Sequence, residues 1–471
     1  MKLNVTTNVD NFLNDFCETV RSFAPILEVD SSASDLLHID CEQTATEIYA
    51  EISLNGKVVS SDNRLKPEAK SLLIDLRHFK RFAKITLYKF LSSYTGVSLP
   101  YGSLTGIRPT KLYYDIAEEG FDPSEQLENY YLVSKPKLEL IRKIVETQKG
   151  IYGFNSSEYD AFANIPVCPT RCAYCSFLAD TIKHSNKFLP DYAVNVARDV
   201  KTQFDMNLGT RRAIYVGGGT PTSVSDDQFE RILRSFDAVG EEFTVEAGRP
   251  ETLTESKIAI MKRAGVTRVS VNPQTFKDST LKLIGRLHTT DDIYRAYDLV
   301  KNAGFDVNMD LIAMLPKESL DDFMTSIRKA IELRPENVTV HTLSVKRGSV
   351  LNKEGLVSTP STEGEKMVEY AYKALVEAGY NPYYTYRQKN TFGRLENVGY
   401  ALPNKACVYN VDIMEETRSI HASGAGAISK KVKRNDSNGE VRIERLSEIK
   451  EVKGYNEQID DLIRKKFEFF S

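Results

Sequence analysis

The chain has few cysteines, no large excess of either charge and no long apolar run. Its 62 basic and 65 acidic residues leave a formal net charge of −3, which provides no broad positive surface for wrapping nucleic acid or coating anionic lipid. No stretch approaches the roughly 18 uncharged apolar residues of a membrane-spanning helix. The first residues, MKLNVTTNVDNFLNDF, lack the basic flank and apolar core of a secretion signal. We therefore expect a soluble, cytoplasmic protein with no membrane span and no nucleic-acid partner.

Size and cysteine usage narrow the class further. With 471 residues, of which 41% are hydrophobic and 27% charged, the chain can bury a full core and is long enough for two or three compact units. Three of the six cysteines lie within eight residues, which favours a metal site in a reducing compartment over a disulfide framework. The other three, Cys17, Cys41 and Cys407, are scattered and are expected to be small buried hydrophobes.

Residues 161–343 alternate short apolar runs with longer amphipathic stretches. AFANIPV precedes DYAVNVARDVKTQF, AIYVGG precedes DQFERILRSFDAV, and three further pairs follow before a last apolar run, NVTVHTL. This alternation predicts six strand–helix units and a parallel sheet with crossover helices, the helices ending at residues such as Gly265 and Gly304. A closed eight-unit barrel needs about 250 residues. We therefore predict an α/β fold with an open, partial (βα)6 barrel.

The flanking segments have different patterns. Residues 1–150 combine strand-like alternation in ATEIYAEISLNGKVV with a helical stretch, SLLIDLRHFKRFAKITLYKFLSSYTG, and are predicted to form a small α+β domain and linker. The barrel is expected over 151–380. Residues 381–471 are predicted to form a C-terminal α+β extension, which is rich in tyrosine and then hairpin-like, and ends in an amphipathic helix. Its tyrosines can line a pocket for a flat substrate, although core packing is the commoner role.

The chemistry is concentrated after the first barrel strand. Cys168, Cys172 and Cys175 present three thiols in a loop that Pro166 and Pro169 keep irregular. Cysteine thiolates hold iron–sulfur clusters, and a cubane normally has four of them, so three thiols leave one iron open to another ligand. A structural zinc site is the alternative, but such a site closes four ligands and no partner pair lies nearby.

The spacing C-x-x-x-C-x-aromatic-C at the end of a first barrel strand resembles the radical S-adenosylmethionine (SAM) superfamily, with Tyr174 at the aromatic position. The resemblance implies that the three cysteines bind a [4Fe-4S] cluster whose open iron is chelated by the amino and carboxylate groups of SAM. It further implies that one electron from the cluster cleaves SAM to methionine and a 5′-deoxyadenosyl radical, which abstracts hydrogen from the substrate.

Glycine and polar residues occur near the ends of the second to fifth predicted strands. Taken one at a time, they can equally be a tight turn, solvated strand ends or structural ion pairs. Together with RVSVNPQTF and LKLIGRLHT they resemble the oxygen-independent coproporphyrinogen III oxidase (dehydrogenase) family, which includes HemN, HemZ and HemW. The resemblance implies that Glu246 and the backbone of 218–220 meet the methionine end of SAM, that Arg286 meets its carboxylate, and that Gln274 and Asp310 bond its ribose. The full set implied for SAM is Tyr174, Gly218, Gly219, Thr220, Glu246, Gln274, Arg286, Asp310 and Ile312.

Within this family the HemZ subgroup is the most similar, through CPTRCAYCSF, EAGRP, VHTLSVKR, SLTGIRPTKL and ENVGYALPNK. It implies an oxygen-independent oxidative decarboxylation of coproporphyrinogen III to protoporphyrinogen IX, with a reduced flavodoxin or ferredoxin-type protein as electron donor. The chain departs from the family pattern in the residues around the cluster motif and in one later strand, at Phe162, Asn164, Val167, Phe177 and Met314. These departures concern the substrate and not the chemistry of SAM.

Cationic residues after the sixth strand are candidates for binding the substrate. His341, Lys346 and Arg347 can pair with the carboxylates of a tetrapyrrole, although a structural role for His341 is equally compatible with the sequence. His288 is expected to cap or pack against the following helix. Two other functions remain: a radical SAM enzyme that modifies or opens haem, which would share the same SAM contacts, and a haem chaperone of the HemW kind, in which the cluster would serve delivery and not catalysis.

Overall fold

The structure is a computed structural model that describes residues 1–69, 71–106, 108–175, 180–238, 240–344, 361–387, 395–435 and 440–471. The chain divides into two compact units. Unit 1 comprises Met1–Lys143 with Asn435–Glu440, and unit 2 comprises Ile144–Arg434 with Val441–Ser471. The predicted boundary near residue 150 therefore corresponds to a division at residue 143, inside helix α5 (Lys135–Thr147).

Unit 1 is an α+β fold. Its five strands follow the order β2-β1-β3-β4-β5, in which β1 is parallel to both of its neighbours and β3, β4 and β5 form an antiparallel meander. The strands are β1 (Lys2–Thr7), β2 (Glu28–Val29), β3 (Leu36–Gln43), β4 (Glu47–Leu54) and β5 (Lys57–Leu65). The helices are α1 (Leu13–Arg21), α2 (Leu72–Thr95), α3 (Pro109–Glu118) and α4 (Pro123–Glu125), the last continued by a π-turn over Gln126–Tyr130.

Helix α2 matches the helix predicted from the sequence. It begins after Ser71, whose hydroxyl accepts a hydrogen bond from the amide of Ile74, and ends at Gly96 in the left-handed region at φ 71°. Its apolar face, including Phe82 and Leu87, packs with side chains of α1 and of the sheet in one hydrophobic core. Burying that face is what holds helix and sheet together.

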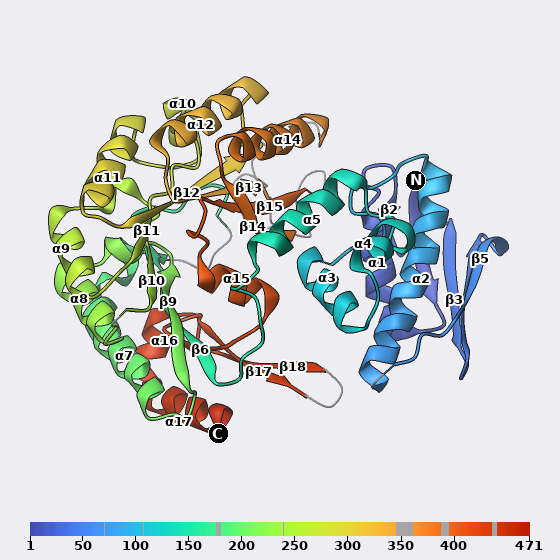
Figure 1. The fold of residues 1–471 in the computed structure, drawn as a ribbon, viewed down its shortest axis with the longest axis horizontal. Helices are drawn as coiled ribbons and strands as arrows, with labels where there is room; N and C mark the ends of the chain where they lie inside the picture. Colours follow the sequence, from blue (N-terminus) through green and yellow to red (C-terminus); the bar gives the residue numbers. More distant parts are fainter. Residues whose placement is uncertain are drawn as a thin grey trace. The chain divides into compact units, whose positions relative to one another are not determined.

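The described residues of unit 2 form a sheet of eleven strands in the order β14-β15-β13-β12-β11-β10-β9-β6-β16-β17-β18 (Figure 1). Six strands run parallel and neighbour one another in chain order: β6 (Glu158–Ile165), β9 (Thr210–Gly218), β10 (Glu242–Glu246), β11 (Arg268–Ser270), β12 (Asp306–Ala313) and β13 (Asn337–Thr342). These are the six strands predicted from the sequence. The predicted partial (βα)6 barrel is confirmed.

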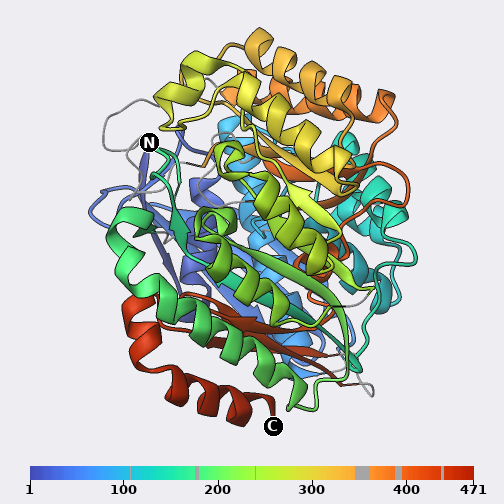
Figure 2. The same cartoon turned by 90° about the vertical axis from the view of Figure 1, so that its left-hand side faces the viewer.

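A crossover helix follows each parallel strand. The helices are α7 (Leu189–Lys201), α8 (Asp226–Arg234), α9 (Glu255–Arg263), α11 (Thr290–Asn302), α12 (Leu320–Leu333) and α14 (Ser361–Glu377). Figure 2 shows several of them as a layer in front of the strands. Gly265 and Gly304, at φ 82° and 87°, follow α9 and α11, as expected for residues that end helices.

Side chains alternate between the helix layer and the inner face of the sheet. On β10, Phe243 and Val245 join the core beneath the helices, so Thr244 and Glu246 point to the other face. The inner face is filled with aromatic side chains: Tyr215 of β9 stacks on Tyr409 with ring centroids 4.7 Å apart.

The segment after residue 381 extends the barrel sheet at both edges. β14 (Asn381–Arg387) and β15 (Glu396–Ala401) add antiparallel strands beside β13, whereas β16 (Ser419–Ser423) lies parallel to β6 and leads into β17 (Ile428–Arg434) and β18 (Val441–Ser447). The antiparallel pairing of β17 with β18 is the predicted hairpin. Helices α15 (Val408–Glu415), α16 (Val452–Glu457) and α17 (Ile459–Phe470) complete the unit.

Most of the tyrosines in this segment pack as core. Tyr383, Tyr384 and Tyr409 are at most 5% exposed and form one cluster with Cys407, because α15 brings Tyr409 against the inner face of the sheet. Core packing, and not the lining of a substrate pocket, is therefore the role of these three tyrosines. Tyr386 differs, since its hydroxyl lies 3.2 Å from Nδ1 of His341.

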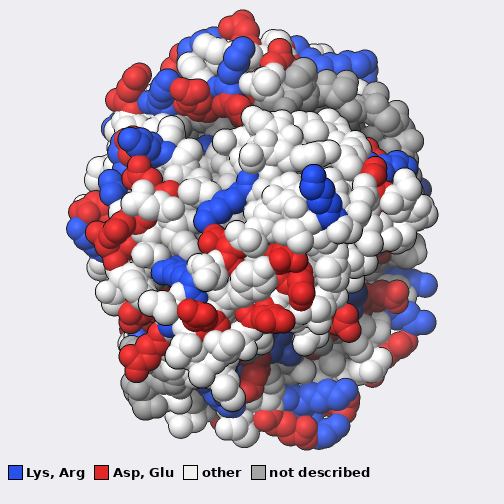
Figure 3. Space-filling view, turned by 90° about the vertical axis from the view of Figure 1, so that its right-hand side faces the viewer, with Lys and Arg blue, Asp and Glu red and all other residues white. Residues whose placement is uncertain are grey.

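The surface carries charges of both signs. In the view of Figure 3, Lys and Arg side chains are interspersed with Asp and Glu among uncharged ones. Of the helices in the described ranges, each is too short or too polar to cross a lipid bilayer.

Candidate functional site

The three clustered cysteines follow β6, at the edge of the sheet where the parallel strands end. Cys168 lies in the short strand β7 (Val167–Cys168), which pairs with β8 (Asp180–Thr181). The loop is anchored to later strand ends: the amide of Thr220 donates to Val167 O at 2.8 Å, and the amide of Ala173 donates to Ile284 O at 2.9 Å. Parallel strands thus gather segments that are up to 116 residues apart in the sequence, from Cys168 to Ile284.

The thiols of Cys168, Cys172 and Cys175 are electrostatic neighbours. Burial raises the pKa of the Cys168 thiol, and Cys172 and Cys175 raise it further, while a hydrogen bond from Thr220 Oγ1, 3.4 Å from Cys168 Sγ, opposes the shift. No group of three or more His, Cys, Asp or Glu side chains in the described part of the chain is arranged to hold a single metal ion. That criterion concerns one ion, whereas the thiolates of an iron–sulfur cluster bind different irons.

Tyr174 and Arg286 lie together beside the cysteine loop. Arg286 Nη2 donates to the Tyr174 hydroxyl at 2.9 Å, and Nη1 donates to Gly248 O at 2.5 Å. Burial strongly raises the pKa of Tyr174, so the phenol stays protonated at neutral pH. The arrangement joins the cysteine loop to the ends of β10 and β11.

The glycine-rich turn after β9 requires residues without side chains. Gly218 has φ 112°, and a Cβ there would lie 1.8 Å from Asn164 Oδ1. A Cβ on Gly219 would lie 2.5 Å from the carbonyl oxygen of Val167, and one on Gly217 would lie 2.9 Å from the Glu246 carboxylate. The turn therefore brings bare backbone next to the cysteine loop and Glu246.

Glu246 ends β10 on the inner face and is held by its neighbour strand. The hydroxyl of Tyr215 donates to Glu246 Oε1 at 2.6 Å. Burial, reinforced by the negative charge of Asp310, raises the pKa of Glu246 to about 7. The carboxyl group can therefore hold or release a proton near neutral pH.

Gln274, Asp310 and Ile312 are brought together by backbone hydrogen bonds. The amide of Gln274 donates to Asp310 O, and the amide of Ile312 donates to Gln274 O, each at 2.9 Å. Gln274 has φ 68°, a left-handed conformation that is uncommon for a residue other than glycine. Burial acts to raise the pKa of Asp310, but His341 and hydrogen bonds from neighbours such as Asn308 hold it below its usual range.

Several buried polar atoms at this edge have no hydrogen-bond partner within the described ranges. They are Asn272 Oδ1, Gln274 Oε1 and Arg286 Nε. Such groups are costly unless a ligand or water satisfies them. Their position beside the glycine turn and Glu246 is what a polar ligand with hydroxyl, amino and carboxylate groups requires.

His341 is the last residue but one of β13 and lies beside Asp310. Its Nε2 lies 3.6 Å from Asp310 Oδ2, and Nδ1 lies within hydrogen-bond distance of Tyr386. The side chain is 26% exposed, so it borders the same open edge of the sheet. The other two predicted substrate residues, Lys346 and Arg347, lie outside the described residues.

The departures from the family pattern have identifiable surroundings. Asn164 Nδ2 donates to Ala425 O at 2.5 Å, while Phe162 stacks on Tyr215 and Val167 is fully buried. Met314 has φ 69°, a left-handed conformation that favours glycine. Its sulfur occupies the space that a Cβ on Gly364 would need, since the two would lie 2.4 Å apart. Phe177 lies outside the described residues.

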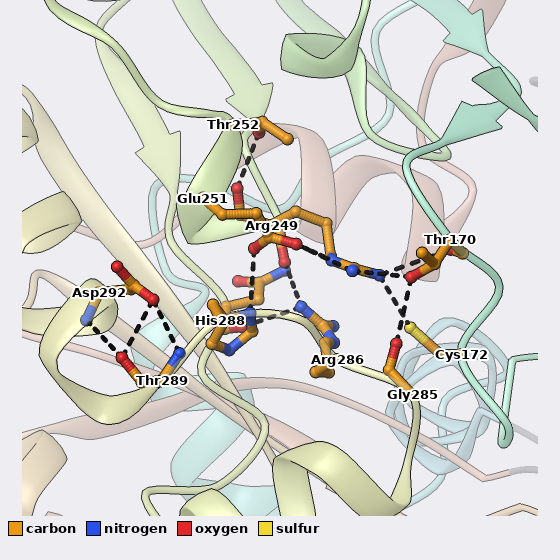
Figure 4. A network of polar contacts seen from close by, with 12 residues as sticks. Thr170, Cys172, Arg249, Glu251, Thr252, Gly285, Arg286, His288, Thr289 and Asp292 are labelled. Carbon is orange, nitrogen blue, oxygen red and sulfur yellow. Dashed lines mark hydrogen bonds and ion pairs between the residues drawn. The ribbon is translucent and has the colours of Figure 1, made fainter. Parts of the chain in front are cut away.

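Two further polar residues at this edge were not predicted, Arg249 and Tyr215. Arg249 lies at the centre of a buried network with Thr170, Cys172 and Glu251 (Figure 4). It belongs to the EAGRP segment directly after β10, a position at the carboxyl end of a parallel strand that could have drawn attention. Tyr215 gave no such signal, because it occurs inside an apolar strand pattern.

His288 is buried, and its polar partner is Glu251. Its side chain is fully buried, and Nδ1 lies 3.0 Å from Glu251 Oε2. The following residue, Thr289, begins α11 through a capping box with Asp292.

Known proteins are similar to this chain in sequence and in fold. Residues 165–330 match the model of the radical SAM superfamily. The oxygen-independent coproporphyrinogen-III oxidase-like protein HemZ of Bacillus subtilis is 37% identical over 416 residues, which cover 83% of this chain and 81% of that protein. The chain belongs to this family of radical SAM proteins.

Other members of the family are similar over a smaller part. The haem chaperone HemW of Lactococcus lactis is 32% identical over 47% of this chain, which spans 60% of that protein. The coproporphyrinogen III oxidase HemN of Escherichia coli has the same fold, with a TM-score of 0.52 and 18% identity over 66% of this chain and 71% of HemN.

The cofactors of this radical SAM protein are a [4Fe-4S] cluster and SAM. The residues fit both groups. Three half-buried cysteine thiols supply the soft ligands of a cluster, and the unpartnered Gln274 Oε1 and Arg286 Nε, next to a turn of bare backbone, suit an amino-acid nucleoside.

Proposed function

We propose that this protein decarboxylates coproporphyrinogen III oxidatively, without oxygen, to protoporphyrinogen IX. In each of two turnovers a propionate side chain would lose one hydrogen atom from its β-carbon, one CO2 and one electron, which leaves a vinyl group. The bound cofactors would supply the group that takes up the hydrogen atom, and an external acceptor would take up the electron. A reduced flavodoxin or ferredoxin-type protein would supply the electron that starts each turnover.

Cys168, Cys172 and Cys175 would hold the cluster. When bound, the cluster and SAM supply one electron and a 5′-deoxyadenosyl radical. The chain's own contribution is to bind and orient SAM and to keep water from the radical.

The SAM contacts would come from several strand ends. Glu246 and the backbone of Gly218 and Thr220 would accept hydrogen bonds from the amino group of SAM, since a carboxylate and bare backbone meet there. Arg286 would donate to the carboxylate, and Gln274 Oε1 and the Asp310 carboxylate would accept hydrogen bonds from the ribose hydroxyls. Tyr174 would keep the Arg286 guanidinium aimed at the cluster loop.

One observation carries this part of the proposal. Gln274 is held in a left-handed conformation by backbone hydrogen bonds to β12, yet its side-chain oxygen is buried without a partner in the described structure. A strained residue with an unsatisfied buried acceptor is stable only if something else compensates, which is typical of a ligand site.

The tetrapyrrole assignment depends on the relationship with HemZ and on His341. The imidazole borders the open edge next to Asp310, at 26% exposure, where it can donate to a propionate that projects toward the SAM contacts. Lys346 and Arg347 follow His341 closely in sequence and would supply further positive charge for a substrate with four carboxylates.

The test is an anaerobic assay of the reconstituted, reduced protein with SAM, with and without coproporphyrinogen III. Mass spectrometry follows 5′-deoxyadenosine and the tetrapyrrole. We expect substrate-dependent 5′-deoxyadenosine and two successive losses of CO2 with hydrogen. Cys172→Ala should abolish both products, whereas Cys17→Ala, a half-buried cysteine of unit 1, should retain them.

Other outcomes would point to the two remaining functions. Cleavage of SAM that ignores coproporphyrinogen III but responds to haem, with a changed haem mass, would replace the proposal with a haem-modifying reaction. Tight binding of haem without cleavage of SAM would replace it with a chaperone function of the HemW kind.

A further inference from the structure

Arg249 is a buried cation that none of the SAM contacts requires. It lies directly after β10, and its side chain is only 3% exposed. Burial of a guanidinium is costly unless its donors are satisfied. The partners that compensate this cost therefore indicate what the residue does.

The guanidinium makes contacts on two sides. On one side Nε donates to Glu251 Oε1 at 2.8 Å. On the other side Nη2 donates to Thr170 Oγ1 at 2.9 Å and Nη1 lies 3.4 Å from Cys172 Sγ, within the range of an N–H···S hydrogen bond (Figure 4). Arg249 thus bridges a carboxylate and the cysteine loop.

A second set of contacts fixes Arg249 in this orientation. Glu251 Oε2 lies 3.0 Å from His288 Nδ1, and the His288 side chain is fully buried. Burial acts to raise the pKa of Glu251, but His288 and Arg249 hold it at about 2, so the carboxylate is ionised over the working pH range. On the loop side, Thr170 donates onward to Gly285 O at 3.1 Å.

Cation and hydrogen-bond donors at a thiolate change the redox behaviour of a cluster. Reduction adds one negative charge to the cluster and its sulfur ligands, and hydrogen bonds to the sulfurs and nearby charge set the reduction potential. A buried, permanently charged donor stabilises the reduced form more than the oxidised form. In a dry environment this effect is larger than at the surface.

We propose that Arg249 is a positioning residue that hydrogen-bonds the Cys172 thiolate and raises the reduction potential of the cluster. It brings the cluster within reach of a protein electron donor before SAM is cleaved. Glu251 and His288 keep the guanidinium directed at Cys172. The inference rests on the cluster of the proposed function but not on the identity of the substrate.

The test is an anaerobic redox titration of the reconstituted protein, without SAM or tetrapyrrole, in which the reduced cluster is followed by electron paramagnetic resonance. Arg249→Met removes the charge and the donor with little change in length. We expect this variant to bind iron and sulfide as the wild type does. Its equilibrium constant for one-electron reduction should fall about tenfold, which corresponds to a midpoint about 59 mV lower.

Arg249→Lys is the second variant. It keeps the charge but cannot contact Glu251, Thr170 and Cys172 together, so we expect a smaller decrease in the same direction. Arg268→Lys is the matched control, because Arg268 is equally buried at 5% side-chain exposure but pairs with Glu242 on the same sheet instead of the cysteine loop. It should titrate like the wild type.

The outcomes distinguish an effect of Arg249 on the reduction potential of the cluster from structural support of the cysteine loop. A wild-type midpoint in Arg249→Met, or loss of the cluster from both Arg249 variants, would overturn the proposal, since a residue that only supports the loop would change cluster content and not potential. The titration contains no tetrapyrrole. A wild type that titrates as described but does not turn over coproporphyrinogen III would therefore defeat only the substrate assignment.

Discussion

The hydroxyl of Tyr215 donates a 2.6 Å hydrogen bond to Glu246, so a side chain of β9 holds the carboxylate that ends β10. The ring of Tyr215 is fixed independently, by stacking on Tyr409 and Phe162. The aromatic core of the inner face therefore sets the position of a proposed SAM contact. Removing only the Tyr215 hydroxyl would therefore test the hydrogen bond to Glu246 while the stacking of the ring is kept.

We predict that Tyr215→Phe keeps the fold but weakens SAM binding. The ring stays stacked, while Glu246 loses its donor, which costs about 1 to 2 kcal/mol for a buried acceptor. The dissociation constant of SAM, measured by calorimetry on the reconstituted protein, should rise about five- to thirtyfold if that cost falls on the bound state. Tyr380→Phe is the control. It removes a similar bond, to Pro335 O at 2.7 Å before β13, and should leave SAM affinity unchanged.

The raised pKa of Glu246 predicts a pH dependence of stability for the protein without cluster or SAM. In the folded state the carboxyl group stays protonated up to about pH 7, whereas in the unfolded chain its pKa is near 4.5. The folded state therefore binds more protons between these values, and the free energy of unfolding falls as the pH rises from 4.5 to 7, by at most about 3 kcal/mol from this group.

Glu246→Gln removes this titration while keeping the shape of the side chain. Denaturant unfolding at several pH values should show a flatter decline for the variant than for the wild type. Two parallel curves would mean that Glu246 is ionised in the folded protein at pH 5 and that the assigned pKa is wrong.

The sequence predicted the barrel because its parallel strands are buried on both faces and read as short apolar runs between amphipathic helices. A local pattern of this kind could not predict which distant segments pair in the sheet. β16 lies beside β6 with Ile420 opposite Asp160, and nothing in either segment indicates the other. The packing of the last segment's tyrosines inside the barrel could not be predicted either, since their position depends on where α15 lies.

The candidate site divides in the same way. The cysteines and the glycine turn could be found because their chemistry depends on spacing within one segment. Arg249 and Tyr215 were not predicted because their roles depend on partners elsewhere: Arg249 contacts Cys172, which lies 77 residues earlier, and Tyr215 donates to Glu246 on the next strand. Met314 adopts a left-handed conformation, φ 69°, that nothing in the local sequence indicates.

The glycine turn predicts a strong steric effect at Gly218. A Cβ in Gly218→Ala would lie 1.8 Å from Asn164 Oδ1, and the residue also has φ 112°. We expect loss of SAM binding in calorimetry and a decrease in unfolding free energy well above the ~1 to 2 kcal/mol that positive φ alone costs. Gly304→Ala is the control, because φ is 87° there and no atom lies within 4 Å of the added Cβ. Equal losses in the two variants would show that Asn164 moves aside freely.

Lys466 fixes the C-terminal helix α17 to the barrel. Its side chain and that of Asp199 are both fully inaccessible, and Nζ lies 2.6 and 2.8 Å from the two carboxylate oxygens. Nζ also donates to Ala422 O at 2.7 Å. Nζ also lies 3.0 Å from Oε1 of the buried Glu448. Lys466→Met leaves these buried carboxyl groups without their cation, which should lower the free energy of unfolding by about 3 to 5 kcal/mol.

The neighbouring lysine provides a matched control for this last prediction. Lys465 is 49% exposed and pairs with Asp461 one helical turn away, so Lys465→Met should cost no more than about 0.5 kcal/mol. Adding Asp199→Asn to Lys466→Met removes one of the two buried carboxylates that face Lys466, the other being Glu448, and should restore part of the stability in denaturant unfolding. If the double variant is as unstable as the sum of the single ones, then α17 is held by its apolar contacts and not by the buried ion pair.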